Sequence, residues 1–160
     1  MARSSSKYSH SVLVARIMRS IAIILNGDPT LWERVGLLHD IDYDLVAADM
    51  SKHGVLGASM LEGKLPEVGL RAIRSHNQRS FIRSHTLLDR ALVFSDCLAA
   101  LIVDRRLSLP CDIAELLEAL RVECIEKPWI GDKIIKFSER EGISLPEVLM
   151  RIVNVDICSL

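Results

Sequence analysis

The sequence predicts a single all-α domain, and three observations lead to this fold class. Apolar residues recur at spacings of three and four along most of the chain, as the buried face of an amphipathic helix requires. Runs in which β-branched and apolar residues alternate with polar ones are scarce, and aromatic residues make up only 4% of the chain. The length of 160 residues suits one domain with a substantial core.

The helices of the first half are delimited by residues that begin or end helices. Asn26-Gly27 ends the first apolar stripe, and Asp28-Pro29 begins the next helix. An aspartate-rich loop follows, after which Ser51 has the hydroxyl of an N-cap. Glycine and proline in residues 63–66 end that helix. We expect helices over residues 9–25, 30–38, 51–62 and 67–76.

The second half continues the same pattern after a polar loop at residues 77–84. Pro110, Pro128 and Gly142 interrupt the apolar stripes. No segment has the composition of a linker, so we expect no division into two folded units. Helices are expected over residues 87–107, 113–122, 131–139 and 145–155.

Charge and hydropathy exclude several classes of partner. The chain carries 20 basic and 21 acidic residues, a net charge of −1, so we expect no general attraction to nucleic acid or to an anionic membrane. No apolar run approaches the ~20 residues that span a bilayer. The first residues lack the apolar core of a secretory signal, and we expect a cytoplasmic protein.

One carboxylate falls on an apolar helix face. Asp96 shares its face with Leu88, Leu92, Ala99 and Val103. A carboxylate withdrawn from water must gain a metal, an arginine or several hydrogen-bond donors, and the pattern alone leaves these alternatives open.

Histidines gather at the ends of other apolar stripes. His39-Asp40 directly follows the apolar residues 35–38, and imidazole nitrogen with carboxylate oxygen suits zinc, iron or manganese. His10, His53 and His76 each stand at a helix end, where helices of a bundle can converge on a metal. Taken singly, such a histidine is more often a core or capping residue.

The order of these residues, H…HD…H…H…D, resembles the HD superfamily of metal-dependent phosphohydrolases. Local context agrees: HSVLVA from residue 10, GLLHDI from residue 36, HGVLGA from residue 53, AIRSHN from residue 72 and SD at residues 95–96. The resemblance covers residues 8–104, which we expect to form the HD-domain core. Residues 105–160 carry none of these motifs and are expected to be extra C-terminal helices packed on the same domain; covering the site or forming a homodimer face are the alternatives.

The resemblance implies roles for each position. His10, His39, Asp40 and Asp96 match the shared metal set, with His39 and Asp40 catalytic and Asp40 bridging two metals. His53 and His76 match the pair that adds a second metal. Two divalent ions are implied, iron or manganese first, with zinc, magnesium, nickel or cobalt as alternatives. The pattern is closest to small bacterial HD hydrolases of diadenosine polyphosphates.

Departures from the motifs of other superfamily members reduce the number of activities that the resemblance implies. Tyr43 stands where guanosine tetraphosphate hydrolases and deoxynucleoside monophosphatases of the superfamily have glutamate, so neither activity is implied. The lysine that often follows the HD pair is missing, and Lys52, just before His53, is a candidate for supplying a nearby positive charge instead. Asp42 and Asp44 are expected either to orient metal ligands or to cap the loop. The candidate substrate-binding residues are Lys52, Asn77, Arg79 and Arg83, although a solvated arginine face is the simpler interpretation for each arginine.

The predicted reaction is hydrolysis of a phosphate-containing small molecule or nucleotide. A divalent ion lowers the pKa of bound water to about 7 and so supplies hydroxide at neutral pH. The same ligand set also occurs in di-iron oxygenases of the superfamily, and a catalytically silent nucleotide-binding protein is a third alternative. Iron with oxygen uptake would indicate the oxygenase, and turnover by metal-loaded protein would exclude the silent binder.

Overall fold

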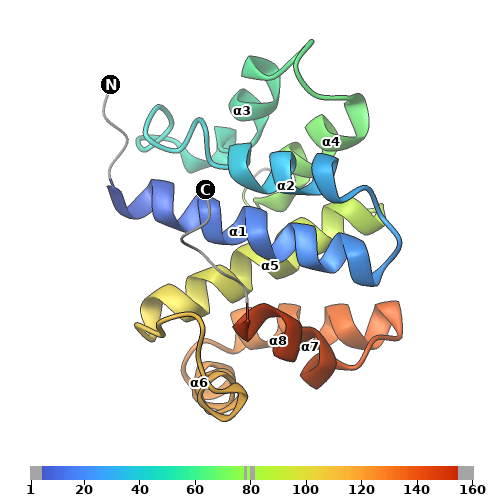
Figure 1. The fold of residues 1–160 in the computed structure, drawn as a ribbon. Helices are drawn as coiled ribbons and strands as arrows, with labels where there is room; N and C mark the ends of the chain where they lie inside the picture. The colour runs from blue at the N-terminus through green and yellow to red at the C-terminus, as the bar shows by residue number, and fades with distance from the viewer. Residues whose placement is uncertain (1–4, 78, 80–81, 155–160) are drawn as a thin grey trace.

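The computed structural model describes residues 5–77, 79 and 82–154, and their secondary structure is entirely helical, as predicted. Helix α5 runs through the middle of the molecule beside α1; helices α2 to α4 lie on one side of this pair and α6 to α8 on the other (Figure 1). The elements are α1 (Ser5–Ile24), α2 (Pro29–Leu38), the 3-10 helix η1 (Met50–Lys52), α3 (Val55–Met60), α4 (Glu67–His76), α5 (Leu87–Asp104), α6 (Ile113–Glu126), α7 (Pro128–Glu141) and α8 (Leu145–Val153).

Helix α5 is central because most of its circumference is apolar. Leu92, Leu98 and Leu101 on this helix are fully buried. Its first turn is fixed by a capping box, in which Thr86 and Asp89 each bond the other's backbone amide. On its far side, Phe94 packs against Phe137 of α7 with ring centroids 4.6 Å apart. The carboxylate predicted on its apolar face is therefore held on a rigid, buried element.

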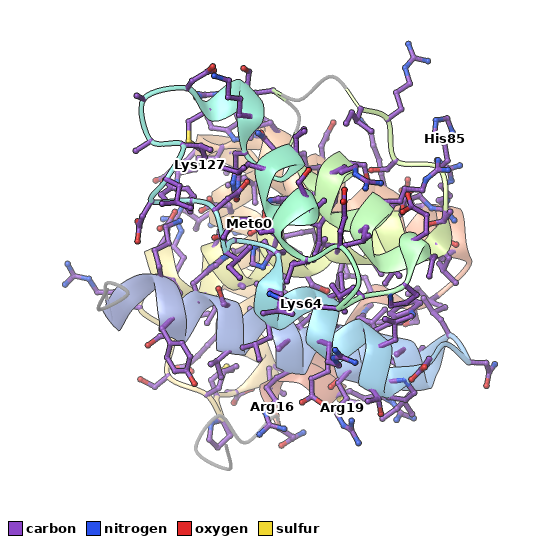
Figure 2. The ribbon with its side chains drawn as sticks, turned by 90° about the horizontal axis from the view of Figure 1, so that it is seen from above. Arg16, Arg19, Met60, Lys64, His85 and Lys127 are labelled. Atoms are coloured by element: carbon purple, nitrogen blue, oxygen red, sulfur yellow. The ribbon has the colours of Figure 1, made fainter. Side chains whose placement is uncertain are left out.

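Helices α1 and α2 pack closely enough to bring their site-bearing residues together. A Cβ added at Gly36 would lie 2.9 Å from the Ala15 Cα, so only glycine permits this approach. On the outer edge of the molecule, Arg16 and Arg19 of α1 reach Glu33 of α2 at 3.4 and 3.0 Å (Figure 2). Buried contacts thus set the distance between the two helices, and ion pairs close their solvent edge.

The helix predicted from Ser51 to residue 62 is wrong in its first turn. Asp49, rather than Ser51, caps a short 3-10 helix by accepting from the Ser51 amide, and α3 begins only at Val55. Gly54 separates the two elements with φ 83°, a backbone conformation that favours glycine. A Cβ at Gly54 would lie 2.5 Å from the Ile73 carbonyl oxygen. This break turns His53 out of the helix and toward α4.

The C-terminal helices share the same core. Leu116, Ile134, Leu149 and Ile152 are fully buried in one cluster with residues of α1 and α5. Helix α7 begins at Pro128, three residues before the predicted start, since proline fits the first turn of a helix. Residue 155, the predicted end of the last helix, lies outside the described residues. The division of the chain at residue 105 stays a prediction.

Among the described residues, every helix is too short or too polar to cross a membrane.

Candidate metal centre

The structure brings all six predicted ligand residues into one cluster, although they come from five parts of the chain. His39 and Asp40 directly follow α2, His76 is the last residue of α4 and His53 lies in the break before α3. His10 is contributed by the first half of α1 and Asp96 by the middle of α5.

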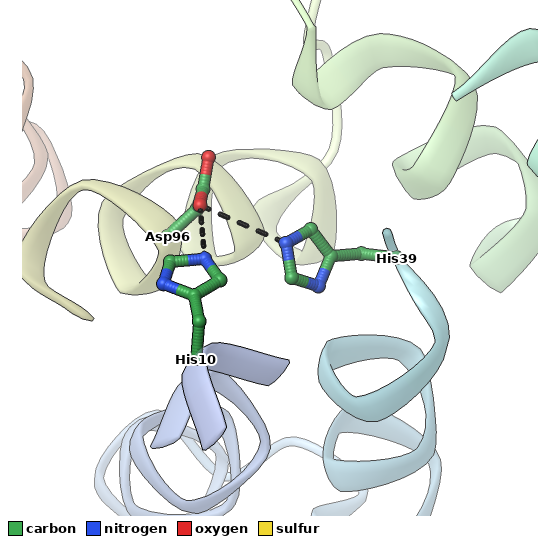
Figure 3. A group of neighbouring side chains, drawn as sticks. All are labelled: His10, His39 and Asp96. Atoms are coloured by element: carbon green, nitrogen blue, oxygen red, sulfur yellow. Dashed lines mark hydrogen bonds and ion pairs between the residues drawn. The ribbon is translucent and has the colours of Figure 1, made fainter. Parts of the chain in front are cut away.

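One half of the cluster consists of His10, His39 and Asp96, which face one another across α1, α2 and α5 (Figure 3). The Nε2 atom of His10 lies 2.9 Å from Asp96 Oδ1, and Nε2 of His39 lies 3.7 Å from the same oxygen. One donor atom from each residue lies within 4.8 Å of the others. Two ligands bound at right angles at about 2.1 Å would be about 3.0 Å apart, so this spacing suits a shared cation.

The other half is centred on the Oδ1 atom of Asp40. This oxygen lies 3.2 Å from His39 Nε2, 3.1 Å from His53 Nε2 and 3.8 Å from His76 Nε2. The two last imidazoles also approach each other, with 3.1 Å between their Nε2 atoms. His39 thus belongs to both halves, and Asp40 is the carboxylate placed between them.

Three of the histidines are locked in the orientation that a metal ligand needs. His39 Nδ1 donates to the Gly36 carbonyl at 2.7 Å, and His76 Nδ1 donates to the Ile73 carbonyl at 2.6 Å. His53 Nδ1 donates to Asp42 Oδ1 at 2.8 Å. Because the proton is committed to Nδ1, the lone pair of each ring is available at Nε2. His39 Nε2 is fully buried without a hydrogen-bond partner among the described residues, which is the environment a metal ion would satisfy.

When no metal is bound, protons on the histidines offset the negative charge of the carboxylates in the cluster. Burial opposes a charge on His39, but the adjacent carboxylates of Asp40 and Asp96 outweigh it and raise the pKa of His39 to about 9. Likewise, Asp40 and Asp42 overcome the cost of burial and raise the pKa of His53 to about 9. The same histidines hold the pKa of Asp40 far below its usual range. A metal must therefore displace protons from the imidazoles.

Asp42 supports the cluster from behind. Its fully buried carboxylate accepts from His53 Nδ1 and also from the amides of Gly54 at 2.9 Å and Gly57 at 2.7 Å. It therefore orients a candidate ligand and caps α3 at the same time. Asp44, the other candidate for these roles, is exposed.

Two clefts open onto the cluster from different sides. A cleft of about 340 Å³ is lined by Lys7, His10, Tyr43 and Ala100, and one of about 240 Å³ is lined by His76, Arg79, Trp129 and Lys133. Both include His53 and Asp96 in their walls. A larger hollow of about 810 Å³ between α1 and α8 is lined by none of the six predicted ligands.

The predicted substrate-binding residues are divided between the site and the surface. Arg79 lines the 240 Å³ cleft, and Arg83 lines an adjoining hollow beside His76. Asn77 commits its amide to the carbonyls of Met50 and His53 at 2.7 and 3.2 Å. Lys52 is exposed and pairs with Asp49 at 3.2 Å, outside the residues that line either cleft. The fifth histidine, His85, lies at the periphery (Figure 2).

Three residues of the site were absent from the predicted set. Lys7 Nζ lies 3.6 Å from Asp40 Oδ2 and 3.4 Å from the centroid of the Tyr43 ring. It supplies the positive charge for which Lys52 was the candidate. Trp129 and Lys133 reach the site from α7. In the sequence, their only signal is a spacing of four residues, which places them on one face of a helix.

Two comparisons with known proteins gave a match. A family model described as HD domain matches residues 8–105. Ribonuclease Y of a Nitratiruptor species is 30% identical over 151 residues, and the match covers 92% of this chain but only 27% of the relative. The chain thus corresponds to about a quarter of that protein's length. No solved structure gives a significant match.

Proposed function

The chain belongs to the HD-domain family, whose superfamily comprises metal-dependent phosphohydrolases, and from this premise we propose that it hydrolyses a phosphate ester or anhydride of a nucleotide at a binuclear metal centre. The observation that carries the proposal is the convergence of four imidazole Nε2 atoms on the carboxylates of Asp40 and Asp96. His10, His39 and Asp96 would hold one ion, His53 and His76 the second, and Asp40 would bridge them.

The protein's own residues would divide the work at this centre. A bound divalent ion supplies a water of lowered pKa and neutralises phosphate oxygens. His39, His53 and His76 hold their Nε2 atoms in place through the Nδ1 hydrogen bonds behind them. Asp96, whose side chain is 33% exposed, faces both clefts and can accept a hydrogen bond from the attacking water.

Lys7 gives the 340 Å³ cleft a positive charge. Its ammonium group lies above the Tyr43 ring and beside Asp40, where the oxygens of a phosphate bound at the centre would come within reach. Since Lys7 is a point charge on a flexible stem, it can follow the phosphate as negative charge moves to the leaving oxygen.

A phosphodiester of RNA is the second candidate substrate. The relative named Ribonuclease Y favours it, and so does the presence of clefts on two sides of the cluster, because a phosphodiester carries a substituent on each side of phosphorus. The resemblance to diadenosine polyphosphate hydrolases, by contrast, rests on the motifs alone. A free nucleotide remains our first proposal, since the net charge of −1 offers no general attraction to a polyanion.

The test begins with protein purified without chelator under nitrogen. Metal content per chain is measured for wild type, Asp40→Ala and His53→Ala, with His85→Ala as the matched histidine control. Each sample is then assayed on a panel of mononucleotides, dinucleoside polyphosphates and a short RNA, following phosphate release and strand cleavage separately.

Each outcome selects one alternative. About two metals in wild type and His85→Ala, about one in His53→Ala, and hydrolysis lost with Asp40→Ala would support the proposal. A single metal in wild type that His53→Ala leaves unchanged would refute the binuclear centre. Two irons with oxygen uptake and no hydrolysis would instead indicate the oxygenase, and metal without any turnover the silent nucleotide binder.

A further inference from the structure

We propose that the 240 Å³ cleft between α4 and α7 is a nucleotide subsite, in which the base stacks on Trp129 and Lys133 with Arg79 binds phosphate. This inference rests on the proposed function, since it names the substrate class of the same centre. It assigns a role in recognition to α7, which lies outside the part of the chain that carries the HD motifs.

The cleft is continuous with the metal centre. Its wall includes His53, His76 and Asp96 on one side and Trp129 with Lys133 on the other. A group bound against the indole would therefore lie beside the candidate ligands, so that its attached phosphate can reach them. Lys133 also lines the neighbouring hollow with Arg83, which extends the basic wall beyond the cleft.

Trp129 is exposed in a way that packing does not require. The other tryptophan, Trp32, is 5% exposed and belongs to the core, whereas Trp129 is 59% exposed. An indole offers a large, flat π-face to a base of any sequence. The other residues that line this cleft are all polar: His53, His76, Asn77, Arg79, Asp96 and Lys133. Inside the cleft the indole therefore faces polar groups, and not the contiguous apolar patch that marks a protein-docking surface.

No carboxylate of the described part of the chain forms an ion pair with the cations of this cleft. Within the described residues, neither Lys133 nor Arg79 has a carboxylate at ion-pair distance, whereas Lys136, one turn along the same helix, pairs with Asp132. Asp96 is the one carboxylate in the wall of the cleft, and it belongs to the candidate ligand set. An anion is thus the complementary ligand, and guanidinium and ammonium groups both bind phosphate.

The start of α7, which carries the indole, is tied to the rest of the fold. Lys127, two residues before Trp129, pairs with Asp104 at 2.5 Å and with Glu123 at 3.3 Å. These contacts tie the beginning of α7 to the end of α5 and to α6. A restrained backbone loses little conformational entropy when a ligand binds, so less of the favourable stacking free energy is offset at this position.

The test measures binding, not turnover, with three probes that carry the base, the phosphate charge or both. A non-hydrolysable phosphonate analogue of AMP carries both base and phosphate charge, methylphosphonate lacks the base, and adenosine lacks the charge. Titration calorimetry under nitrogen, on the manganese-loaded 160-residue protein, compares wild type with Trp129→Ala, Trp129→Phe and Lys133→Ala. Ile125→Ala, an exposed apolar residue on α6, and Lys136→Ala on α7 serve as matched controls.

We expect the AMP analogue to bind at least about tenfold more tightly than methylphosphonate. Trp129→Ala should remove most of that difference, on the order of tenfold, and Trp129→Phe should retain most of it. Lys133→Ala should weaken both phosphonates and leave adenosine unchanged. Equal affinity for the two phosphonates, or an affinity for the analogue that Trp129→Ala does not alter, would overturn the subsite.

The two proposals fail in different ways. If base-dependent binding at Trp129 is found while no phosphate compound is hydrolysed, the proposed function is wrong and the subsite stands. If hydrolysis occurs with rates and affinities indifferent to Trp129, the subsite is wrong and the hydrolase stands.

Discussion

Replacing Asp42 with asparagine should weaken the fold and the His53 side of the metal centre together. The carboxylate is fully buried and accepts three hydrogen bonds, from one imidazole and two backbone amides. The asparagine side chain would keep the size of the aspartate but would turn an NH₂ group toward at least one of these donors. Hydrogen bonds to a charged group contribute about 1.5–3 kcal/mol each, and an unsatisfied buried donor costs about 1–3 kcal/mol.

From these values we expect Asp42→Asn to lower the free energy of unfolding by roughly 2–4 kcal/mol in chelator. Loss of the carboxylate that orients a ligand imidazole typically reduces metal affinity about 10- to 100-fold, and the reduction should fall on one of the two ions only. The pKa of Asp42 is lowered by its partners despite burial. Its stabilisation is therefore present above pH 3.8, the ordinary value, and the deficit of the variant should shrink as pH falls below it.

Urea denaturation and calorimetric titration with manganese measure the two effects. Asp44→Asn is the matched control, because Asp44 is exposed and two residues away. The reasoning is refuted if Asp42→Asn unfolds within about 0.5 kcal/mol of wild type, the range of ordinary surface substitutions. It is equally refuted if both ions bind the variant with wild-type affinity.

Four further predictions concern protons, backbone and charge. The pKa values of His39 and His53 are about 9 in the metal-free protein, so metal binding at pH 7 should release about two protons. Calorimetry in buffers of different ionisation enthalpy measures this release. An equal release at about pH 10 would contradict the prediction. For the same reason, the stabilisation from these two histidines is present below pH 6.5 and lost as pH rises through 9, so chelator-treated protein should melt at lower temperature at about pH 10 than at pH 6.5. Gly54→Ala should cost more than ~2 kcal/mol of stability, since φ is 83° and the new Cβ would meet the Ile73 carbonyl at 2.5 Å. The control Gly63→Ala, with φ 74° and open space around it, should cost only ~1 kcal/mol. Equal melting temperatures for the two variants would rule out the clash. Lys7→Ala should lower kcat/KM on a phosphate substrate on the order of tenfold, and a larger loss with Lys52→Ala would return the role to the lysine first expected from the sequence.

Helix positions were predictable because they depend on local periodicity. The stripe of Leu88, Leu92 and Ala99, at steps of three and four around Asp96, predicts a buried helix face without knowledge of what covers it. The break at Gly54 was missed because a glycine inside an apolar pattern is compatible with a continuing helix. What forbids continuation is the approach of the Ile73 carbonyl from α4, a contact between segments that the local pattern does not contain.

The candidate ligands were predictable for a different reason, namely their order and local motifs. Spacing along the chain identified six residues, but it gave no indication of which atoms face inward. The choice of Nε2 depends on partners such as the Gly36 carbonyl and Asp42. Lys7 and Trp129 were missed because neither belongs to a motif, and each becomes part of the site only through the packing of α1 or α7 beside it.

If Trp129 and Lys133 bind the nucleotide as we propose, chemistry and recognition are encoded in different parts of this chain. All six candidate ligands lie between residues 10 and 96, on helices whose mutual packing is fixed by buried contacts such as that of Gly36 with Ala15. The wall opposite His53 and His76 comes instead from α7. Substitutions at Trp129 and Lys133, neither of which is buried, change what the cleft can bind without disturbing the buried residues that hold the ligands. On this proposal, substrate preference can change through α7 while the candidate ligands stay in place, and the motifs in the first two thirds of the chain would predict the reaction but not the substrate.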